Sequence, residues 1–383
     1  MKYRKFGKLD WEVSTLGFGI MRLPIEDKDY GKIKKDEAKK IIRFAIDAGV
    51  NYLDTAWIYH RENSEGFLGE VLADGYRKKV KIATKMPTWM VEKPDDLDRF
   101  FDEQMERLQI DHIDFYLLHA LKQDWWDRMK NFKYLDWAEK KMADGVIGHL
   151  GFSFHDQFPV FKQIIDDYDN WTLAMVQHNY MDIEREAGLA GIEYAVDKGL
   201  AIVVMEPLRG GQLAKKQPKE VQEIFSKAVP NRSAAEWGFK WLWNDRKVSV
   251  VLSGMSSMEQ LEQNLVTVDN TEAGSFTGGE IEAIAEVRKV YEAKAAIRCT
   301  DCRYCLPCPQ GVSIPFVFDY FNMAKVYDDV RTAKGYYSML GDENNATKCT
   351  MCGKCVEHCP QNLQIMDLLK ECHELLHTQK VTS

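Results

Sequence analysis

The sequence predicts an α/β fold, in which a closed (β/α)8 TIM barrel, residues 1–290, is followed by a small and mostly helical domain, residues 291–383. Two observations lead to this division. Short apolar or β-branched runs alternate with longer amphipathic stretches from about residue 15 to residue 252, which is the pattern of repeated βα units. All nine cysteines lie at or beyond Cys299.

The first part of the chain contains eight runs that read as strands: residues 15–19, 51–54, 81–85, 113–119, 150–153, 174–177, 201–205 and 248–252. Eight parallel strands with helices between them close most simply into a barrel. Residues 36–48 place five apolar side chains along one helical face and stop before Gly49. Thr277 and Glu280 form a capping-box pattern at the start of a later helix.

Composition narrows the class of partner. The chain has 383 residues and a formal charge of −8, with Lys and Arg mixed among Asp and Glu. It offers no basic field to a phosphate backbone, so we expect no nucleic acid partner. No apolar run approaches the roughly 18 residues that span a bilayer, and the basic N-terminus lacks the apolar stretch of a signal peptide. We expect a cytoplasmic protein without a membrane partner.

Eight of the cysteines form two groups, and a proline follows the fourth member of each: Cys299, Cys302, Cys305 and Cys308, then Cys349, Cys352, Cys355 and Cys359. The second group has the CxxCxxCxxxCP spacing with which bacterial ferredoxins hold [4Fe-4S] clusters. The first group departs from it, with only two residues before its last cysteine. Zinc, which four thiolates bind tetrahedrally, is the main alternative. Disulfides are disfavoured because CxxC neighbours cannot join distant segments.

Ligand exchange between the groups is expected, because in two-cluster ferredoxins the fourth cysteine of a motif binds the other cluster. One cluster would then use Cys299, Cys302, Cys305 and Cys359, and the other Cys349, Cys352, Cys355 and Cys308. Residues 317–340 read as mostly helical, which is typical of helical two-cluster ferredoxins. The tail is therefore predicted to be a ferredoxin-like iron-sulfur domain, and Cys372 has no role in it.

Three polar residues end predicted strands: Asp54 closes NYLD, Lys85 closes KIATK and His119 closes DFYLLH. Catalytic residues of (β/α)8 barrels lie at these carboxyl ends. Tyr59 follows Asp54 by five residues, on the loop that leaves the second strand. A charged Lys85, held by Asp54, would stabilise the phenolate of Tyr59. With His119 as a hydrogen-bond donor, the site would protonate an oxygen while hydride arrives at carbon.

Five segments occur in one order up to about residue 268: DTAWIYHRENSEGFLGEVL, KIATK, IDFYLLHA, DGVIGHLGFSFH and SGMSSMEQLEQNL. Through them the chain resembles the aldo-keto reductase family, in its iron-sulfur subgroup with a C-terminal two-cluster domain. The resemblance implies NAD(P)H-dependent reduction of an aldehyde or ketone, with reversible alcohol oxidation. It implies that Tyr59 is the general acid and base, tuned by Lys85 and Asp54. It also implies that His119 orients the substrate carbonyl.

The resemblance further implies where NADP or NAD would bind. Ser153 and Gln177 would hold the carboxamide, and the other positions are Gly19, Ile20, Met205, Glu206, Leu208, Gly254, Gln260 and Asn264. Many family members place Lys, Ser and Arg around the 2'-phosphate of NADP, where this chain has Gly254, Met255 and Gln260. The choice between NADP and NAD therefore stays open, with Arg209 as a candidate substitute.

Two functions remain in competition at this point, and a third, a regulatory barrel that binds nicotinamide without useful turnover, is disfavoured by the intact set of Asp54, Tyr59, Lys85 and His119. The first is carbonyl reduction of a small molecule by the barrel. The alternative is an electron-transfer protein whose barrel is chiefly a nicotinamide-binding or docking platform, with a ferredoxin, flavodoxin or flavoprotein as redox partner. A fold does not reveal a substrate. The candidates for an apolar pocket are Trp57, Trp89, Trp125 and Trp126, and the first choice is Trp57 because it stands between Asp54 and Tyr59.

Overall fold

The computed structural model describes residues 1–27, 29–215, 217–294, 297–326 and 329–377. The chain forms two compact groups. The first consists of Met1–Pro207 and Phe239–Ser275, and the second of Leu208–Gly238 and Phe276–Ser383. Helix α9 (Ala234–Asn244) begins in the second group and ends in the first. The domain boundary between residues 290 and 291 stays a prediction.

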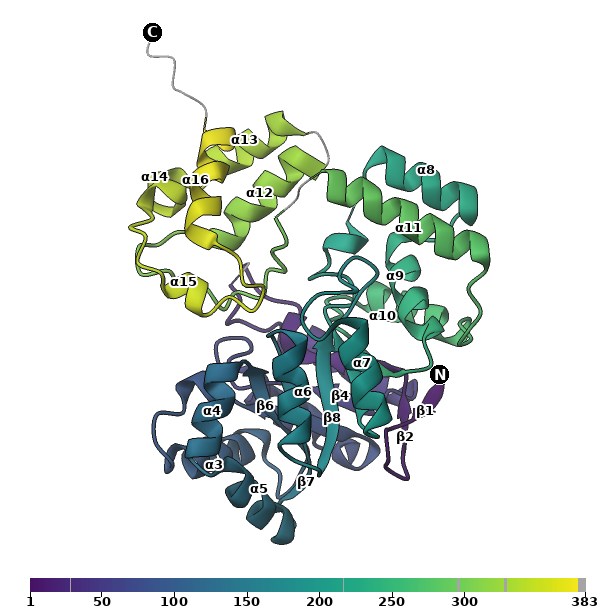
Figure 1. Cartoon of the computed structure of the whole chain (residues 1–383), viewed down its shortest axis with the longest axis vertical. Helices are drawn as coiled ribbons and strands as arrows, with labels where there is room; N and C mark the ends of the chain where they lie inside the picture. Colours follow the sequence, from purple (N-terminus) through teal and green to yellow (C-terminus); the bar gives the residue numbers. More distant parts are fainter. Residues whose placement is uncertain (28, 216, 295–296, 327–328, 378–383) are drawn as a thin grey trace. The chain divides into compact units, whose positions relative to one another are not determined.

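A closed barrel of parallel strands forms the centre of the first group (Figure 1). The strand order is β10, β3, β4, β5, β6, β7, β8 and β9. Their bounds are β3 (Leu16–Gly19), β4 (Tyr52–Asp54), β5 (Lys81–Met86), β6 (Ile113–Leu121), β7 (Ile147–Phe154), β8 (Trp171–Gln177), β9 (Ala201–Met205) and β10 (Val248–Ser253). Each of the eight predicted runs overlaps one of these strands, so the predicted (β/α)8 barrel is confirmed.

A hairpin closes one end of the barrel. Strands β1 (Tyr3–Lys5) and β2 (Glu12–Ser14) pair antiparallel, and Phe6 follows the first of them. The Phe6 ring packs against Tyr52 and Phe115, with centroids 5.9 and 5.0 Å away, near the beginning of their strands. The amino-terminal end is thus filled by apolar side chains, which leaves the carboxyl ends of the strands for polar chemistry.

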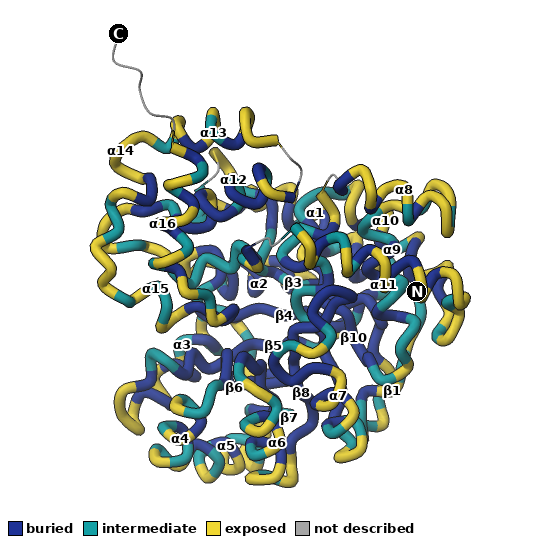
Figure 2. The backbone as a smooth tube through the Cα atoms, turned by 45° about the horizontal axis from the view of Figure 1, so that its top comes forward, coloured by how far each residue is buried: buried dark blue, intermediate teal, exposed yellow. Residues whose placement is uncertain are grey.

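Amphipathic helices surround the strands, with their outward faces exposed and the strands buried (Figure 2). Helix α1 (Lys35–Asp47) buries the five apolar residues predicted for its inner face and ends before Gly49, whose φ of 101° suits glycine. The other helices of this group are α2 (Ser64–Leu72), α3 (Asp96–Leu108), α4 (Gln123–Asn131), α5 (Tyr134–Ala143), α6 (Phe158–Asp166), α7 (Gly188–Asp197) and α10 (Met258–Asp269).

The second group is helical throughout its described regular elements. They are α8 (Lys219–Ala228), α11 (Gly278–Ala293), α12 (Ile314–Val326), α13 (Val330–Met339), α14 (Gly341–Asn344), α15 (Lys354–Glu357) and α16 (Ile365–Leu376), besides short 3-10 turns. The predicted capping box starts α11, where Thr277 and Glu280 each bond the other's backbone nitrogen. Val317, Phe321 and Leu369 belong to the apolar core beside the cysteines. The helical ferredoxin-like tail is confirmed.

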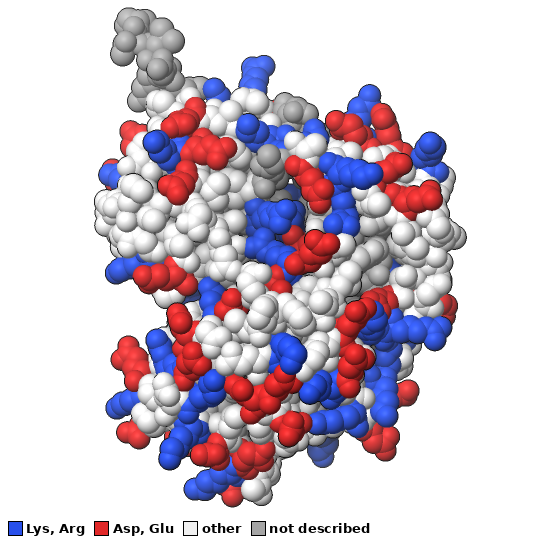
Figure 3. All heavy atoms as spheres, viewed as in Figure 1, with Lys and Arg blue, Asp and Glu red and all other residues white. Residues whose placement is uncertain are grey.

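The outer surface matches the mixed charge of the sequence. On the face shown in Figure 3, Lys and Arg side chains are interspersed with Asp and Glu side chains. Among the residues that the structure describes, no helix is both long and apolar enough to cross a membrane.

Candidate functional site

A buried ion pair lies at the carboxyl ends of β4 and β5. Lys85 Nζ donates to Asp54 Oδ1 and to the backbone oxygen of Thr55, each at 2.7 Å. The two charged side chains are only 1% and 4% exposed. Burial lowers the pKa of Lys85 and raises that of Asp54, and their mutual attraction opposes both shifts. Because these hydrogen bonds fix both side chains, the Lys85 ammonium group has a fixed position at the strand ends.

Tyr59 lies beside this pair, on the loop between β4 and α2. Lys85 Nζ is 5.0 Å from the centre of the Tyr59 ring. The next residues, 60–62, all adopt left-handed backbone conformations with φ between 51° and 70°, which makes a sharp turn after the tyrosine. The buried His60 ring fixes that turn, since both of its nitrogens bond backbone groups, at 2.9 and 3.3 Å. The loop thus holds the Tyr59 ring close to the ion pair.

His119 comes at a break in the strand ladder. The pairing of β6 with β7 shifts register between Leu118 and Leu121, and Ala120 has a φ of 57°. A bulge at a barrel rim redirects a side chain. The His119 ring lies edge-on to that of Tyr59, with centroids 6.1 Å apart.

The environment keeps the His119 ring neutral. Burial, and then electrostatic interaction with Lys85 and His155, lower its pKa well below the ordinary value. The Thr88 hydroxyl donates to the His119 backbone oxygen at 2.7 Å, which fixes the residue at the rim. A neutral imidazole donates one hydrogen bond, as a carbonyl oxygen requires. The structure therefore brings the three strand-end residues and the loop residue Tyr59 to one mouth of the barrel. The tetrad consists of Asp54, Tyr59, Lys85 and His119.

The buried carboxylate of Glu65, which the sequence analysis did not identify, is connected to Lys85 through Thr84 and Gln104. Glu65, on α2, accepts hydrogen bonds of 2.5 Å from both Thr84 Oγ1 and Gln104 Nε2. Gln104 also donates to the backbone oxygen of Lys85 at 3.1 Å. Burial raises the pKa of Glu65 to about 7, although its hydrogen bonds and the nearby Arg107 oppose the shift. Its place in the segment NSEGFLG, next to the candidate tyrosine loop, was the one available signal.

Two candidate carboxamide-binding residues are fixed at the ends of β7 and β8. Ser153 Oγ accepts a hydrogen bond of 2.7 Å from Ala120 N. Gln177 Nε2 donates to the buried Asp182 at 3.3 Å, and Asn179 donates to the same carboxylate oxygen at 3.1 Å. Since the amide nitrogen of Gln177 faces Asp182, its amide oxygen faces the other way.

The remaining nucleotide candidates divide between the two groups. Those of the first group lie at or after the ends of β3, β9 and β10, or on α10, and are Gly19, Ile20, Met205, Glu206, Gly254, Gln260 and Asn264. Leu208 and Arg209 belong to the second group. Arg22, which the sequence did not single out, lies against Gly254, because a Cβ atom there would sit 2.9 Å from Arg22 Cβ. The Ser256 hydroxyl donates to the Arg22 backbone oxygen at 2.7 Å, so the loop after β10 holds the arginine's backbone.

The tryptophans occupy two kinds of position. Trp89 lies 5.0 Å from the His119 ring and 5.7 Å from Trp125, centroid to centroid, so these two form an aromatic wall beside the tetrad. The role of Trp57 stays a prediction: its buried ring packs edge-on against Phe100, and the Arg107 guanidinium lies 3.7 Å from the centre of the ring. Trp126 is structural, since it is buried and donates to Asp167 at 2.8 Å.

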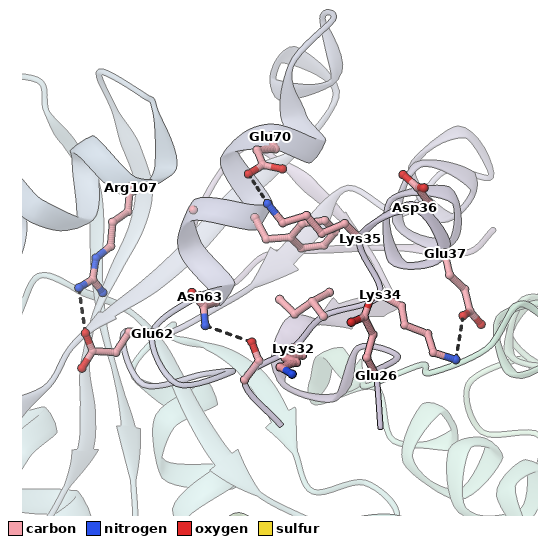
Figure 4. A pocket seen from close by; sticks show the side chains of 14 residues that line it. Glu26, Lys32, Lys34, Lys35, Asp36, Glu37, Glu62, Asn63, Glu70 and Arg107 are labelled. Atoms are coloured by element: carbon pink, nitrogen blue, oxygen red, sulfur yellow. Dashed lines mark hydrogen bonds and ion pairs between the residues drawn. The ribbon is translucent and has the colours of Figure 1, made fainter. Parts of the chain in front are cut away.

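A polar hollow of about 740 Å³ lies elsewhere, between the loop before α1 and the start of α2 (Figure 4). Its lining includes oppositely charged pairs, with Lys35 bonded to Glu70 at 2.7 Å and Arg107 to Glu62 at 3.0 Å. None of the four tetrad side chains lines it. These neutralised charges suit a solvated surface better than a ligand site.

The eight cysteines gather in two sets that cross the sequence groups. Burial raises the pKa of the Cys302 thiol, and its thiol neighbours that act in the same direction are Cys299, Cys305 and Cys359. Burial also raises the pKa of the Cys355 thiol to about 11, and there the thiol neighbours are Cys349, Cys308 and Cys352. Cys305 is also influenced by Cys355, so the two sets lie near each other, and the exchange of the fourth cysteine stays a prediction. Two sets of four thiols have the donor chemistry of two cubanes.

Comparison with known proteins finds two family models that match successive parts of the chain. Residues 15–287 match the model of the aldo/keto reductase family, and residues 298–363 match that of the 4Fe-4S dicluster domain. Uncharacterized oxidoreductase YqkF of Bacillus subtilis (strain 168) is 25% identical over 330 residues, covering 76% of this chain and 99% of that protein. L-galactose dehydrogenase of Arabidopsis thaliana is 24% identical over 310 residues, covering 76% and 95%.

The barrel is also similar to a solved structure, the aldo-keto reductase AKR11C1 from Bacillus halodurans in its holo form. The TM-score is 0.63 at 25% identity, over 75% of this chain and 96% of that one. Both kinds of comparison cover about three quarters of the chain, the share that the barrel accounts for.

Proposed function

Since the chain belongs to the aldo/keto reductase family of oxidoreductases, we propose that its barrel reduces an aldehyde or ketone with NADPH or NADH. The observation that carries this proposal is the buried Asp54–Lys85 pair beside Tyr59. A bound nicotinamide would supply hydride to the carbonyl carbon. Ser153 and Gln177 would hold its carboxamide, because their side chains are already oriented by the protein.

The chain's own residues would supply the proton. Tyr59 would donate its phenolic proton to the carbonyl oxygen, so that one hydride and one proton convert the carbonyl to an alcohol. The Lys85 ammonium, aimed by Asp54, would stabilise the phenolate that remains. Neutral His119 would donate a hydrogen bond to the same oxygen and orient the substrate.

The choice of nucleotide rests on Arg22. The Lys, Ser and Arg expected around a 2'-phosphate are absent from positions 254, 255 and 260. The Cβ, Cγ and Cδ atoms of Arg22, which ends the 3-10 turn Ile20–Arg22, lie 2.9 to 3.3 Å from the place that a Cβ atom at position 254 would take, so an arginine side chain passes beside the first of these positions. We therefore favour NADPH over NADH, because a guanidinium binds phosphate through paired hydrogen bonds.

The tail would bind two [4Fe-4S] clusters. Cys299, Cys302, Cys305 and Cys359 would hold one, and Cys349, Cys352, Cys355 and Cys308 the other. Thiolate ligation requires reduced cysteines, so a cytoplasmic setting suits the tail. Clusters of this kind exchange single electrons, and a ferredoxin, flavodoxin or flavoprotein would be the matching partner.

Steady-state reduction of aldehydes by NADPH and NADH, in the wild type and in Tyr59→Phe, tests the proposal. The phenylalanine keeps the ring but removes the proton donor. We expect kcat to fall about 10²- to 10⁴-fold, the usual contribution of a positioned acid. Equal turnover by the two proteins would refute this role for Tyr59. Reduction of the iron-sulfur clusters by NADPH without any aldehyde turnover would favour the electron-transfer alternative.

A further inference from the structure

A second polar pair lies close to the tetrad and has no part in the chemistry above. His155 Nδ1 is 3.2 Å from Glu186 Oε1, and the two side chains are 7% and 2% exposed. His155 directly follows β7, and Glu186 lies on the loop between β8 and α7. A buried carboxylate on one ring nitrogen fixes the ring orientation and leaves the other nitrogen to act.

The position of His155 is set by the barrel rim. Its backbone nitrogen donates to the Leu121 oxygen at 3.0 Å, which continues the β6–β7 pairing past His119. It also stands two residues beyond Ser153, so it continues the same face of the strand about 6.5 Å further from the barrel floor. Electrostatic interaction with His155 is one of the causes that lower the pKa of His119, as expected for rings at the same mouth.

The other ring nitrogen remains available for a ligand. Among the described residues, no hydrogen bond occupies Nε2 of His155. Glu186 Oε2 is likewise buried without a hydrogen-bond partner in the described part of the chain. Buried polar atoms without partners are costly, and in a binding site a ligand commonly supplies the missing bond.

We propose that the His155–Glu186 pair binds a hydroxyl group of the substrate, so that the barrel selects hydroxylated aldehydes or ketones. The inference rests on the proposed function, and it deepens that function by naming the substrate class. His155 Nε2 is the contacting atom, and Glu186 is a positioning residue that acts through the ring.

A hydroxyl suits this site better than a purely acidic or basic group. With Nδ1–H donating to Glu186, a neutral His155 accepts a hydrogen bond at Nε2, whereas a protonated one donates it. A hydroxyl does either, so binding holds in both protonation states. The carbonyl itself would lie nearer Tyr59 and His119, deeper in the barrel, which leaves His155 for a group farther along the substrate.

The test compares two aldehydes of equal size. D-glyceraldehyde carries two hydroxyls, and 2-methylbutanal has methyl groups in their place. The measured quantity is kcat/KM for D-glyceraldehyde divided by kcat/KM for 2-methylbutanal. It is determined in the wild type, in His155→Phe and in Glu186→Gln. We expect a wild-type ratio well above one and a fall of about tenfold or more in His155→Phe, the worth of one buried hydrogen bond to a charged or polarised group. Glu186→Gln keeps the imidazole of His155 but holds its orientation less firmly, so we expect a smaller fall in the ratio.

His149→Phe is the matched control, because His149 lies on the same strand near the opposite end of the barrel and stacks on Phe115. Its ratio should equal that of the wild type. Titration of each protein with NADPH, followed by tryptophan fluorescence, separates the substrate from the cofactor. A ratio unchanged in both mutants overturns the proposal. If the ratio is unchanged and NADPH binding is weaker in the mutants, the proposal is also overturned, and the pair is assigned to nicotinamide binding instead.

The two proposals fail in different ways. Wild-type reduction of 2-methylbutanal depends on Tyr59 and not on any substrate hydroxyl. If that aldehyde is reduced but the ratio is near one, the hydroxyl site is refuted and carbonyl reduction stands. If neither aldehyde is reduced, carbonyl reduction itself is refuted. Circular dichroism spectra and melting curves establish that each mutant is folded before its ratio is interpreted.

Discussion

In the barrel, the tetrad side chains are fixed by protein groups before any ligand binds, whereas in the tail the cysteines lie mostly on loops and one-turn elements. Lys85 has two hydrogen bonds of 2.7 Å. The cysteine segments instead turn through left-handed residues, including Asp301, Arg303 and Met351. Preorganised dipoles suit hydride transfer, which must not wait for the protein to rearrange. Thiols, in contrast, gain their order from the iron that they bind.

The largest expected effect is the loss of a cluster from the tail, with the barrel left intact. Cys355→Ser removes one thiolate from the set around Cys349, Cys352 and Cys308, and we expect the protein to lose about half of its iron and sulfide. Cys372→Ser is the matched control, because Cys372 is fully buried in α16 and lies outside both sets. Anaerobic purification with iron and sulfide analysis and an absorbance spectrum makes the measurement. Equal iron in the two mutants would contradict the ligand assignment.

A second prediction concerns the support behind the ion pair. Because the pKa of Glu65 is raised to about 7 in the folded chain, the unfolded chain loses this proton first as the pH rises. The group therefore adds its full stability below about pH 4 and loses it progressively between about pH 4 and 7. The loss should amount to roughly 2–3 kcal/mol in the free energy of unfolding.

Glu65→Gln should remove that decline, since glutamine does not titrate. Urea unfolding of wild type and mutant at pH 5 and pH 8 measures the difference between them at each pH. The mutant should gain stability relative to the wild type on going from pH 5 to pH 8. A difference that does not change with pH would show that Glu65 is ionised throughout, and that the barrel tolerates a buried charge behind Lys85.

The smallest expected effect concerns the affinity of the barrel for the two nucleotides. Arg22→Ala should weaken NADPH binding by about tenfold and leave NADH binding nearly unchanged, because only NADPH carries the 2'-phosphate. Fluorescence titration with both nucleotides gives the two dissociation constants, with Lys8→Ala as a control at the opposite end of the barrel. Equal weakening for both nucleotides would mean that Arg22 supports the loop rather than the phosphate.

The sequence predicted the parts of the molecule that follow from periodicity and spacing. Strand runs fix the barrel, and in a barrel the ends of strands converge, so Asp54, Lys85 and His119 could be expected at one mouth. Cysteine spacing likewise predicted an iron-sulfur tail, which the match to the 4Fe-4S dicluster domain supports. These features need only local pattern and a known topology.

The sequence did not predict the directions of side chains or the contacts between segments that are far apart in the chain. Trp57 stands between Asp54 and Tyr59 in the sequence, yet its ring packs against Phe100 and Arg107, which come from α3. Arg22 meets Gly254 across more than two hundred residues of chain. The His155–Glu186 pair similarly joins two loops, so neither residue carried a signal alone.

The proposed mechanism takes all of its groups from the barrel, namely the tetrad with Ser153 and Gln177, so its central claim is that hydride transfer does not need the clusters. The most direct measurement is kcat/KM for D-glyceraldehyde with NADPH in folded Cys355→Ser, beside wild type and Tyr59→Phe, with iron quantified in each preparation. We predict that the serine mutant retains turnover close to that of the wild type while Tyr59→Phe loses about 10² or more. Loss of turnover in step with the lost iron would contradict the claim and make the clusters part of the catalytic cycle.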